Sequence, residues 1–320
     1  MTHQEPAAHM PPPPPGSLSA EAIAHIAAMQ AGGVPEVDMA QIAPIRGFVE
    51  QIQQMLGAEQ RKAHPVTITE AEIAGVPVRR IVREDGEIDR GKVLMNLHGG
   101  GFAVDAGSLT ENIPIAALSG IEVVAVRYRL SPEHPYPAAV DDALAVYQAL
   151  LADHQPSNIG LYGTSAGAVI GPQLIMRLKA EGLPLPGALG VFSGEPNLAG
   201  DTDSLNIFAT SYEARMLTEA KRNYVGAADP TDPMLSPIFG DLSFFPPTLC
   251  VSSGRDILMS GTVNLARKLS DEGVTTELIV YDALPHAFWA NILAPESDDA
   301  FRRMTGFLVK HLGGDQHRAK

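Results

Sequence analysis

Cysteine, clustered positive charge and long apolar runs are scarce in this sequence, and each shortage excludes a class of protein. The chain of 320 residues has one cysteine, Cys250, so neither an intramolecular disulfide nor a zinc site of several cysteines can form. Lys and Arg number 23 against 37 Asp and Glu, and the net charge of −14 without a basic cluster argues against nucleic acid or an anionic membrane as partner. No stretch approaches the roughly 20 apolar residues of a membrane-spanning helix, and the N-terminus has no signal-peptide pattern. We therefore expect a cytoplasmic protein.

The composition and the apolar pattern of the sequence change along its length. Apolar residues make up 45% of the 320 residues, enough for one large globular domain with an accessory region. A proline run at residues 11–15 favours extended geometry and cannot enter a helix or a sheet interior. The predicted organisation is a disordered Pro-rich tail in residues 1–16, N-terminal cap helices in 17–60, a core in 61–204 and 237–320, and a cap insertion in 205–236.

Short apolar runs alternate with helical patterns after Arg90, which is typical of parallel strands joined by crossover helices. Before them, segments on either side of Gly75 show the alternation of an antiparallel pair. The expected strands are residues 66–68, 76–82, 93–97, 121–128, 159–162, 189–192, 248–252 and 277–281. The expected helices are residues 19–31, 42–56, 138–152, 166–181, 261–272 and 298–312. The predicted fold class is α/β, with a mostly parallel sheet of eight strands flanked by helices.

A candidate nucleophile lies in Gly163-Thr164-Ser165-Ala166-Gly167, directly between an expected strand and an expected helix. This is the context that a G-x-S-x-G nucleophile turn requires, since the strained serine backbone tolerates only small residues two positions away on either side. The same pentapeptide also suits an ordinary strand-to-helix turn, so the motif alone does not decide between the two.

A glycine loop, His98-Gly99-Gly100-Gly101, follows the expected strand that ends at Leu97. Backbone N–H groups of glycine can approach a negative oxygen without an intervening side chain, which suits an oxyanion hole for acyl transfer. We assign this role to Gly100 and one of its neighbours Gly99 or Gly101, together with the amide of Ala166. No Gly-Lys-Ser/Thr follows, so a phosphate-binding loop is disfavoured.

An acid and a base follow the last two expected strands. Asp256 comes after residues 248–252 and His286 after residues 277–281, so the chain order is Ser165, Asp256, His286. This is the order of the catalytic triad in α/β-hydrolases and differs from the order in chymotrypsin or subtilisin. Either residue alone has an ordinary structural explanation, but the order and placement together predict a triad.

These motifs together resemble the hormone-sensitive-lipase-like carboxylesterases of bacteria, also called family IV, within the α/β-hydrolase superfamily. The resemblance runs from about residue 93 to the C-terminus and includes Tyr-Arg-Leu-Ser-Pro-Glu-His-Pro-Tyr-Pro-Ala-Ala at residues 128–139. It implies an α/β-hydrolase fold with a helical cap and hydrolysis of small-molecule acyl esters without a metal or cofactor. Thr164 resembles the branch with a GTSAG turn rather than the one with Asp before the nucleophile. Relatives often dimerise through a sheet edge, which suggests a homodimer.

Two positions depart from the family pattern. Glu195 lies in Gly-Glu-Pro where many relatives have Pro-Trp, and Ser260 stands where many have a second acidic residue after the triad acid. Glu195 either lines the site near Ser165 or is a surface or structural carboxylate, and the latter is favoured. His98 is expected to support its loop, and Cys250, within an apolar strand, to pack in the core.

The predicted chemistry is a serine carboxylesterase reaction through an acyl-enzyme, with a preference for short to medium acyl chains. An amidase or lactonase on the same triad stays open, because nucleophile and oxyanion hole do not identify the leaving group. A non-catalytic small-molecule receptor with this fold is the rival from another class. It predicts a damaged triad, whereas every triad and glycine residue is present.

Overall fold

A computed structural model of the chain describes residues 15–32, 42–200, 202–209 and 211–313. Most of the predicted tail of residues 1–16 lies outside these ranges. Among the described residues, no helix has the length and apolar character needed to cross a membrane.

One sheet of eight strands forms the centre of the fold, in the order β1-β2-β4-β3-β5-β6-β7-β8. The strands are β1 Val66–Ile73, β2 Val76–Arg83, β3 Val93–Leu97, β4 Glu122–Val126, β5 Ile159–Thr164, β6 Ala188–Phe192, β7 Thr248–Arg255 and β8 Thr276–Pro285. β1 pairs antiparallel with β2, and β2 with β4, while the remaining neighbours are parallel. The predicted fold class and all eight predicted strands are confirmed.

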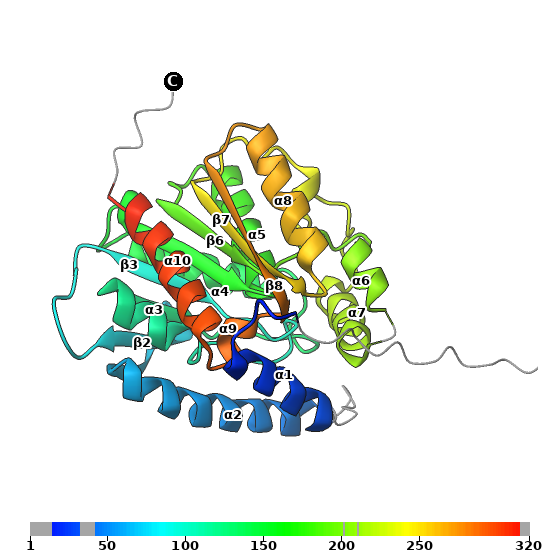
Figure 1. Cartoon of the computed structure of the whole chain (residues 1–320). Coiled ribbons are helices and arrows are strands. Elements are labelled where there is room, and N and C mark those ends of the chain that lie inside the picture. The colour runs from blue at the N-terminus through cyan, green and yellow to red at the C-terminus, as the bar shows by residue number, and fades with distance from the viewer. Residues whose placement is uncertain (1–14, 33–41, 201, 210, 314–320) are drawn as a thin grey trace, which may run out of the picture.

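Helices cover both faces of the sheet (Figure 1). They are α1 Ala20–Gly32, α2 Ile42–Ala63, α3 Asn112–Ser119, α4 Ala138–Leu150, α5 Gly167–Ala180, α6 Asp203–Ile207, α7 Tyr212–Val225, α8 Met259–Asp271, α9 Phe288–Asn291 and α10 Pro295–His311, with 3-10 turns at Pro156–Asn158 and Pro237–Phe239. α4, α5 and α8 contribute side chains to one core cluster, and α1, α3, α9 and α10 to the other. The six predicted helices are present, whereas α3 and α9 were not expected.

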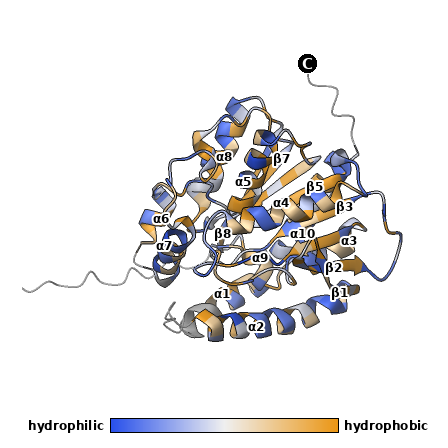
Figure 2. Cartoon of the chain, turned by 180° about the vertical axis from the view of Figure 1, so that it is seen from behind, coloured by the Kyte–Doolittle hydropathy of each residue, from blue (hydrophilic) through white to orange (hydrophobic). Residues whose placement is uncertain are grey.

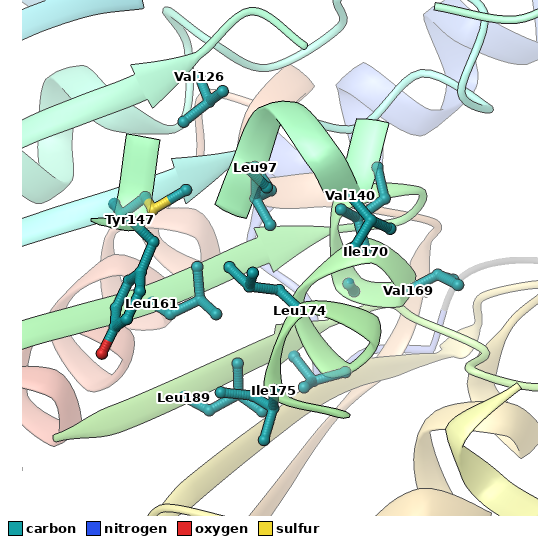
Figure 3. Close-up of a cluster of buried hydrophobic side chains, with 14 of the residues drawn as sticks. Leu97, Val126, Val140, Tyr147, Leu161, Val169, Ile170, Leu174, Ile175 and Leu189 are labelled. Carbon is teal, nitrogen blue, oxygen red and sulfur yellow. The ribbon is translucent and has the colours of Figure 1, made fainter. Parts of the chain in front are cut away.

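The interior strands are apolar along their whole length because both of their faces are covered. β3 and β5 are buried at every position, and the hydropathy colouring places the apolar residues in the sheet and the polar ones on outer helix faces (Figure 2). In the cluster between the sheet and α5, Leu161 and Leu189 from the strands lie against Leu174 and Ile175 from the helix (Figure 3). This packing fixes α5, and with it the turn at its start. Cys250 is fully buried in β7, as expected of a packing residue.

The carboxyl ends of β5, β7 and β8 carry the segments with the predicted triad residues. α6 and α7 lie together at one end of the sheet, and α1 and α2 lie side by side (Figure 1). α1 and α7 lie within the two segments predicted as a cap, and α2 and α6 overlap their ends; the division into cap and core stays a prediction.

Candidate active site

Ser165 occupies a strained turn between β5 and α5. Its backbone φ is +55°, in the left-handed region that side chains rarely adopt. A Cβ on Gly163 would lie 2.4 Å from the carbonyl carbon of Gly167, and a Cβ on Gly167 would lie 1.8 Å from the oxygen of Leu97. Both glycines are therefore required sterically, which is what the pentapeptide predicted. The Ser165 amide donates to the Phe192 carbonyl at 2.9 Å, so β6 holds the turn in place.

The glycine loop packs directly against this turn. A Cβ on Gly99 would lie 3.4 Å from the Cβ of Ser165, and Gly100, at φ +118°, has room for no side chain because Val104 O would be 2.1 Å away. Among the hydrogen bonds of the described residues, none uses the amides of Gly100, Gly101 or Ala166 as donor. The amides predicted to bind an oxyanion thus have no competing partner in this part of the chain.

His98 supports the loop, as its position in the sequence suggested. Its ring stacks on Tyr128 with 4.1 Å between centroids, and its Nδ1 lies 2.8 Å from the Gly99 carbonyl oxygen. The Tyr128 hydroxyl donates to the His98 carbonyl at 2.7 Å. These contacts hold the backbone of the glycine loop from behind.

Asp256 and His286 are hydrogen-bonded to each other, with 2.7 Å between Oδ1 of Asp256 and Nδ1 of His286. The carboxylate is fully buried and also accepts from the Leu258 amide at 2.9 Å and the Ser252 hydroxyl at 2.7 Å. Burial would raise the pKa of Asp256, but His286, with hydrogen bonds from Ser193 and the Leu258 amide, holds it below its usual value. The group is therefore an ionised carboxylate bound to one nitrogen of the histidine.

The nucleophile turn and the histidine loop are joined through β6. Ser165 binds Phe192, and the hydroxyl of the next residue, Ser193, accepts from the amide of Ala287 at 3.4 Å. Ser165, Asp256 and the loop that carries His286 therefore lie at the same edge of the sheet, at the carboxyl ends of β5, β7 and β8. The hydrogen bonds of the described residues do not include one between Ser165 and His286; such bonds often tighten only when substrate binds.

A small, mostly apolar cavity lies beside Ser165. Its lining consists of Phe102, Ser165, Ala166, Val169, Glu195, Leu198, Leu217, Lys221 and Leu258. Glu195 is 2% exposed and its carboxylate lies 3.5 Å from the Lys221 ammonium. The structure therefore supports the expectation that Glu195 lines the site near Ser165, rather than the expectation of a surface or structural carboxylate. Ser260, the second position that departs from the family pattern, exchanges hydrogen bonds with Ser204 that join α8 to α6.

No motif in the sequence marks Glu111, a buried carboxyl behind the turn that carries Ser165. Its Oε1 accepts from the Trp289 indole at 3.4 Å, and Trp289 follows the His286 loop. Burial raises the pKa of Glu111 to about 7, against opposing contributions from Thr164, Trp289 and Asn96. Glu111 precedes α3, a helix that the sequence did not predict, and this explains why it was missed.

No group of three His, Cys, Asp or Glu side chains in the described part of the chain is placed to hold a metal ion. The structure instead places near one sheet edge a serine in a strained turn, a histidine hydrogen-bonded to a buried carboxylate, and loop amides that donate to no group among the described residues. That arrangement suits attack on a carbonyl carbon.

Comparison with known proteins identifies the family. The sequence profile of the alpha/beta hydrolase fold matches residues 94–290. The chain belongs to this family. The solved structure of an esterase from the bacterial hormone-sensitive lipase family has a TM-score of 0.79 at 29% identity and covers 92% of this chain and 99% of its own. The hydrolase described here is therefore a hormone-sensitive-lipase-like carboxylic ester hydrolase, as the motifs predicted.

Two further relatives agree with this assignment. The structure of an esterase E25 superposes with a TM-score of 0.82 at 32% identity, covering 95% of this hydrolase and 97% of that chain. An acetyl-hydrolase of Streptomyces hygroscopicus is 30% identical over 73% of this chain and 79% of its own length.

Proposed function

We propose that this hydrolase cleaves small-molecule carboxylic esters of short to medium acyl chains, with Ser165 as nucleophile, His286 as base and Asp256 as orienting acid. The observation that carries the proposal is the Asp256–His286 hydrogen bond of 2.7 Å, formed at the same sheet edge as a serine held at φ +55°. We further propose that the amides of Gly100, Ala166 and one of Gly99 or Gly101 form the oxyanion hole.

The first half of the reaction forms an acyl-enzyme. Neutral His286 takes the proton of Ser165 as its oxygen attacks the ester carbonyl, and the negative oxygen is stabilised by the loop amides and the start of α5. His286 then gives its proton to the departing alcohol. Asp256 stabilises the positively charged imidazole and holds its Nδ1 proton, which leaves the other nitrogen facing the serine.

Water completes the cycle. The same histidine takes a proton from water as it attacks the acyl-enzyme, and returns it to Ser165 as the acid product leaves. One oxyanion donor is typically worth about 3 kcal/mol of barrier, so the hole contributes a large share of the rate. An amidase or a lactonase would use the same steps. The three activities differ in the group that leaves the carbonyl carbon, which is an alcohol for an ester, an amine for an amide and the ring oxygen for a lactone.

A labelling experiment with a substrate panel tests the proposal. We expect an organophosphate to modify one residue, Ser165, and p-nitrophenyl esters to be hydrolysed faster than the matched anilides. An intact, folded protein that is neither labelled nor active on any ester would favour the receptor alternative. Preference for palmitate with activation at an oil interface would instead indicate a lipase.

The activity is expected to rise with pH into the alkaline range. Burial by itself would lower the pKa of His286, but Asp256, with Glu213 and Glu111, raises it to about 9. The base works only when neutral, so kcat/KM should increase by about tenfold per pH unit well below this pKa and level off above it. The measurement is kcat/KM for a non-ionising ester between pH 5 and 10, with folding checked by circular dichroism. A plateau already reached at pH 6 would contradict this assignment.

A substitution at Glu213 of α7 should shift the dependence of kcat/KM on pH. Glu213→Gln removes a negative charge that favours the protonated form of His286, so the rising part of the profile should shift to lower pH. Glu219→Gln on the same helix is the matched control and should leave the profile in place. A shift in both variants would trace the effect to the overall charge of α7 rather than to Glu213.

A further inference from the structure

The cavity beside Ser165 is small enough to limit what it accepts. Its volume is about 10 Å³, close to what one water molecule or one methyl group occupies. Phe102, Leu198, Leu217 and Leu258 give it apolar walls, while Glu195 and Lys221 are the charged residues among the described residues of its lining. An acyl group attached to Ser165 that enters this cavity therefore meets a buried ion pair after very few carbon atoms.

Both members of this pair are held from several sides. Lys221 is 8% exposed, and its ammonium lies 3.5 Å from Glu195 and 3.2 Å from the Gly200 carbonyl. Glu195 packs on α8, where a Cβ on Gly261 would come within 2.6 Å of the glutamate Cβ. Moving the pair would take two charged groups out of an arrangement in which each compensates the burial of the other.

The helix that carries Lys221 is also anchored to the core. The Tyr224 ring stacks on Phe102 with 3.8 Å between centroids, and its hydroxyl donates to Gln173 at 2.6 Å. Gln173 donates in turn to the Leu235 carbonyl at 2.6 Å. Because Lys221 lies one turn before Tyr224, its backbone cannot move away without disrupting these buried contacts.

We propose that the Glu195–Lys221 pair closes the acyl pocket and restricts the enzyme to acetyl and similarly short acyl esters. The inference rests on the proposed function and makes its substrate class narrower. An acetyl group places only a methyl in the cavity, whereas each further methylene has to displace the pair or remain outside the pocket. A single methylene in an apolar pocket changes kcat/KM by about 10- to 200-fold, so the selectivity should be steep.

The test compares acyl chain lengths in a variant with an emptied pocket. For wild type, kcat/KM on p-nitrophenyl acetate should exceed that on the octanoate by more than about 100-fold. Glu195→Ala/Lys221→Ala removes both charges of the pair together, so neither of the two is left buried without the other, and should bring this ratio down by at least about tenfold. Arg222→Ala is the matched control, because Arg222 is the next residue of the same helix with a side chain 77% exposed, and should keep the wild-type ratio.

A second series separates the two sides of the ester. With acetyl held constant and the alcohol varied from ethyl to octyl, the double alanine variant should behave as wild type does. A change confined to the alcohol series would assign the cavity to the alcohol and overturn the proposal, as would a wild-type preference for octanoate. If the double alanine variant does not fold, Glu195→Gln/Lys221→Ala replaces it with the same expected direction.

Failure of this inference differs from failure of the proposed function. An active, organophosphate-labelled double alanine variant with an unchanged chain-length ratio overturns only the role of the pair. Loss of labelling and of ester hydrolysis in the wild-type protein overturns the proposed triad itself.

Discussion

Ser165→Ala is expected to lower kcat/KM on p-nitrophenyl acetate by roughly 10³- to 10⁶-fold without unfolding the protein. The change removes a single oxygen from a side chain that is 7% exposed. It leaves the glycines on either side of the turn, and the bond from the residue 165 amide to Phe192, in place. The measurement is steady-state hydrolysis, with circular dichroism as the check on folding.

Ser243→Ala is the control for this experiment, because Ser243 is an exposed serine far along the chain from the turn. It should retain wild-type activity and organophosphate labelling, while the Ser165 variant loses both. Residual activity within about tenfold of wild type, or about 1.4 kcal/mol of transition-state stabilisation, would rule out Ser165 as the nucleophile.

The strands and the order of the motifs were predictable because they are local properties of the sequence. β3 and β5 are buried on both faces, so they are continuous apolar runs, and each ends in a motif with glycines that only a tight turn needs. The alternating pattern around Gly75 likewise identified the antiparallel pair β1 and β2. For each of these assignments, the residue types within a short stretch of sequence were sufficient.

The surroundings of the triad were not predictable in the same way, because they depend on segments that meet only after folding. Glu111 lies 178 residues from Trp289, and Lys221 lies 26 residues from Glu195, with no motif that marks either pair. α3 was missed because its eight residues are almost all apolar and give no amphipathic pattern. Glu195 could be placed near the site from its strand, but its burial and its lysine partner required the structure.

Asp256→Asn is expected to preserve the fold and ester binding and to reduce turnover. In serine proteases the corresponding change costs about 10⁴-fold, because the amide imposes the wrong histidine tautomer. Here the same substitution meets a different set of partners. Oδ1 of Asp256 accepts from both His286 and the Leu258 amide, while Oδ2 accepts from the Ser252 hydroxyl.

These partners determine how the asparagine orients. If its oxygen takes the Oδ1 position, it keeps both N–H donors, and its NH₂ faces Ser252, whose hydroxyl can accept as well as donate. The reverse orientation would set the NH₂ against the Leu258 amide and is disfavoured. The working tautomer of His286 is then retained and only the negative charge is lost, so we expect a decrease nearer 10²-fold than 10⁴-fold.

The pH profile distinguishes this loss of charge from a tautomer change. Asp256 is the main group that raises the pKa of His286, so in Asp256→Asn the rising part of kcat/KM should move to lower pH, with a reduced plateau. Asp271→Asn, at an exposed position on α8, is the matched control and should leave both unchanged. A reduced plateau with the rising part at its wild-type pH would show that Asp256 does not set the charge on the base. Unchanged activity would place the triad acid elsewhere.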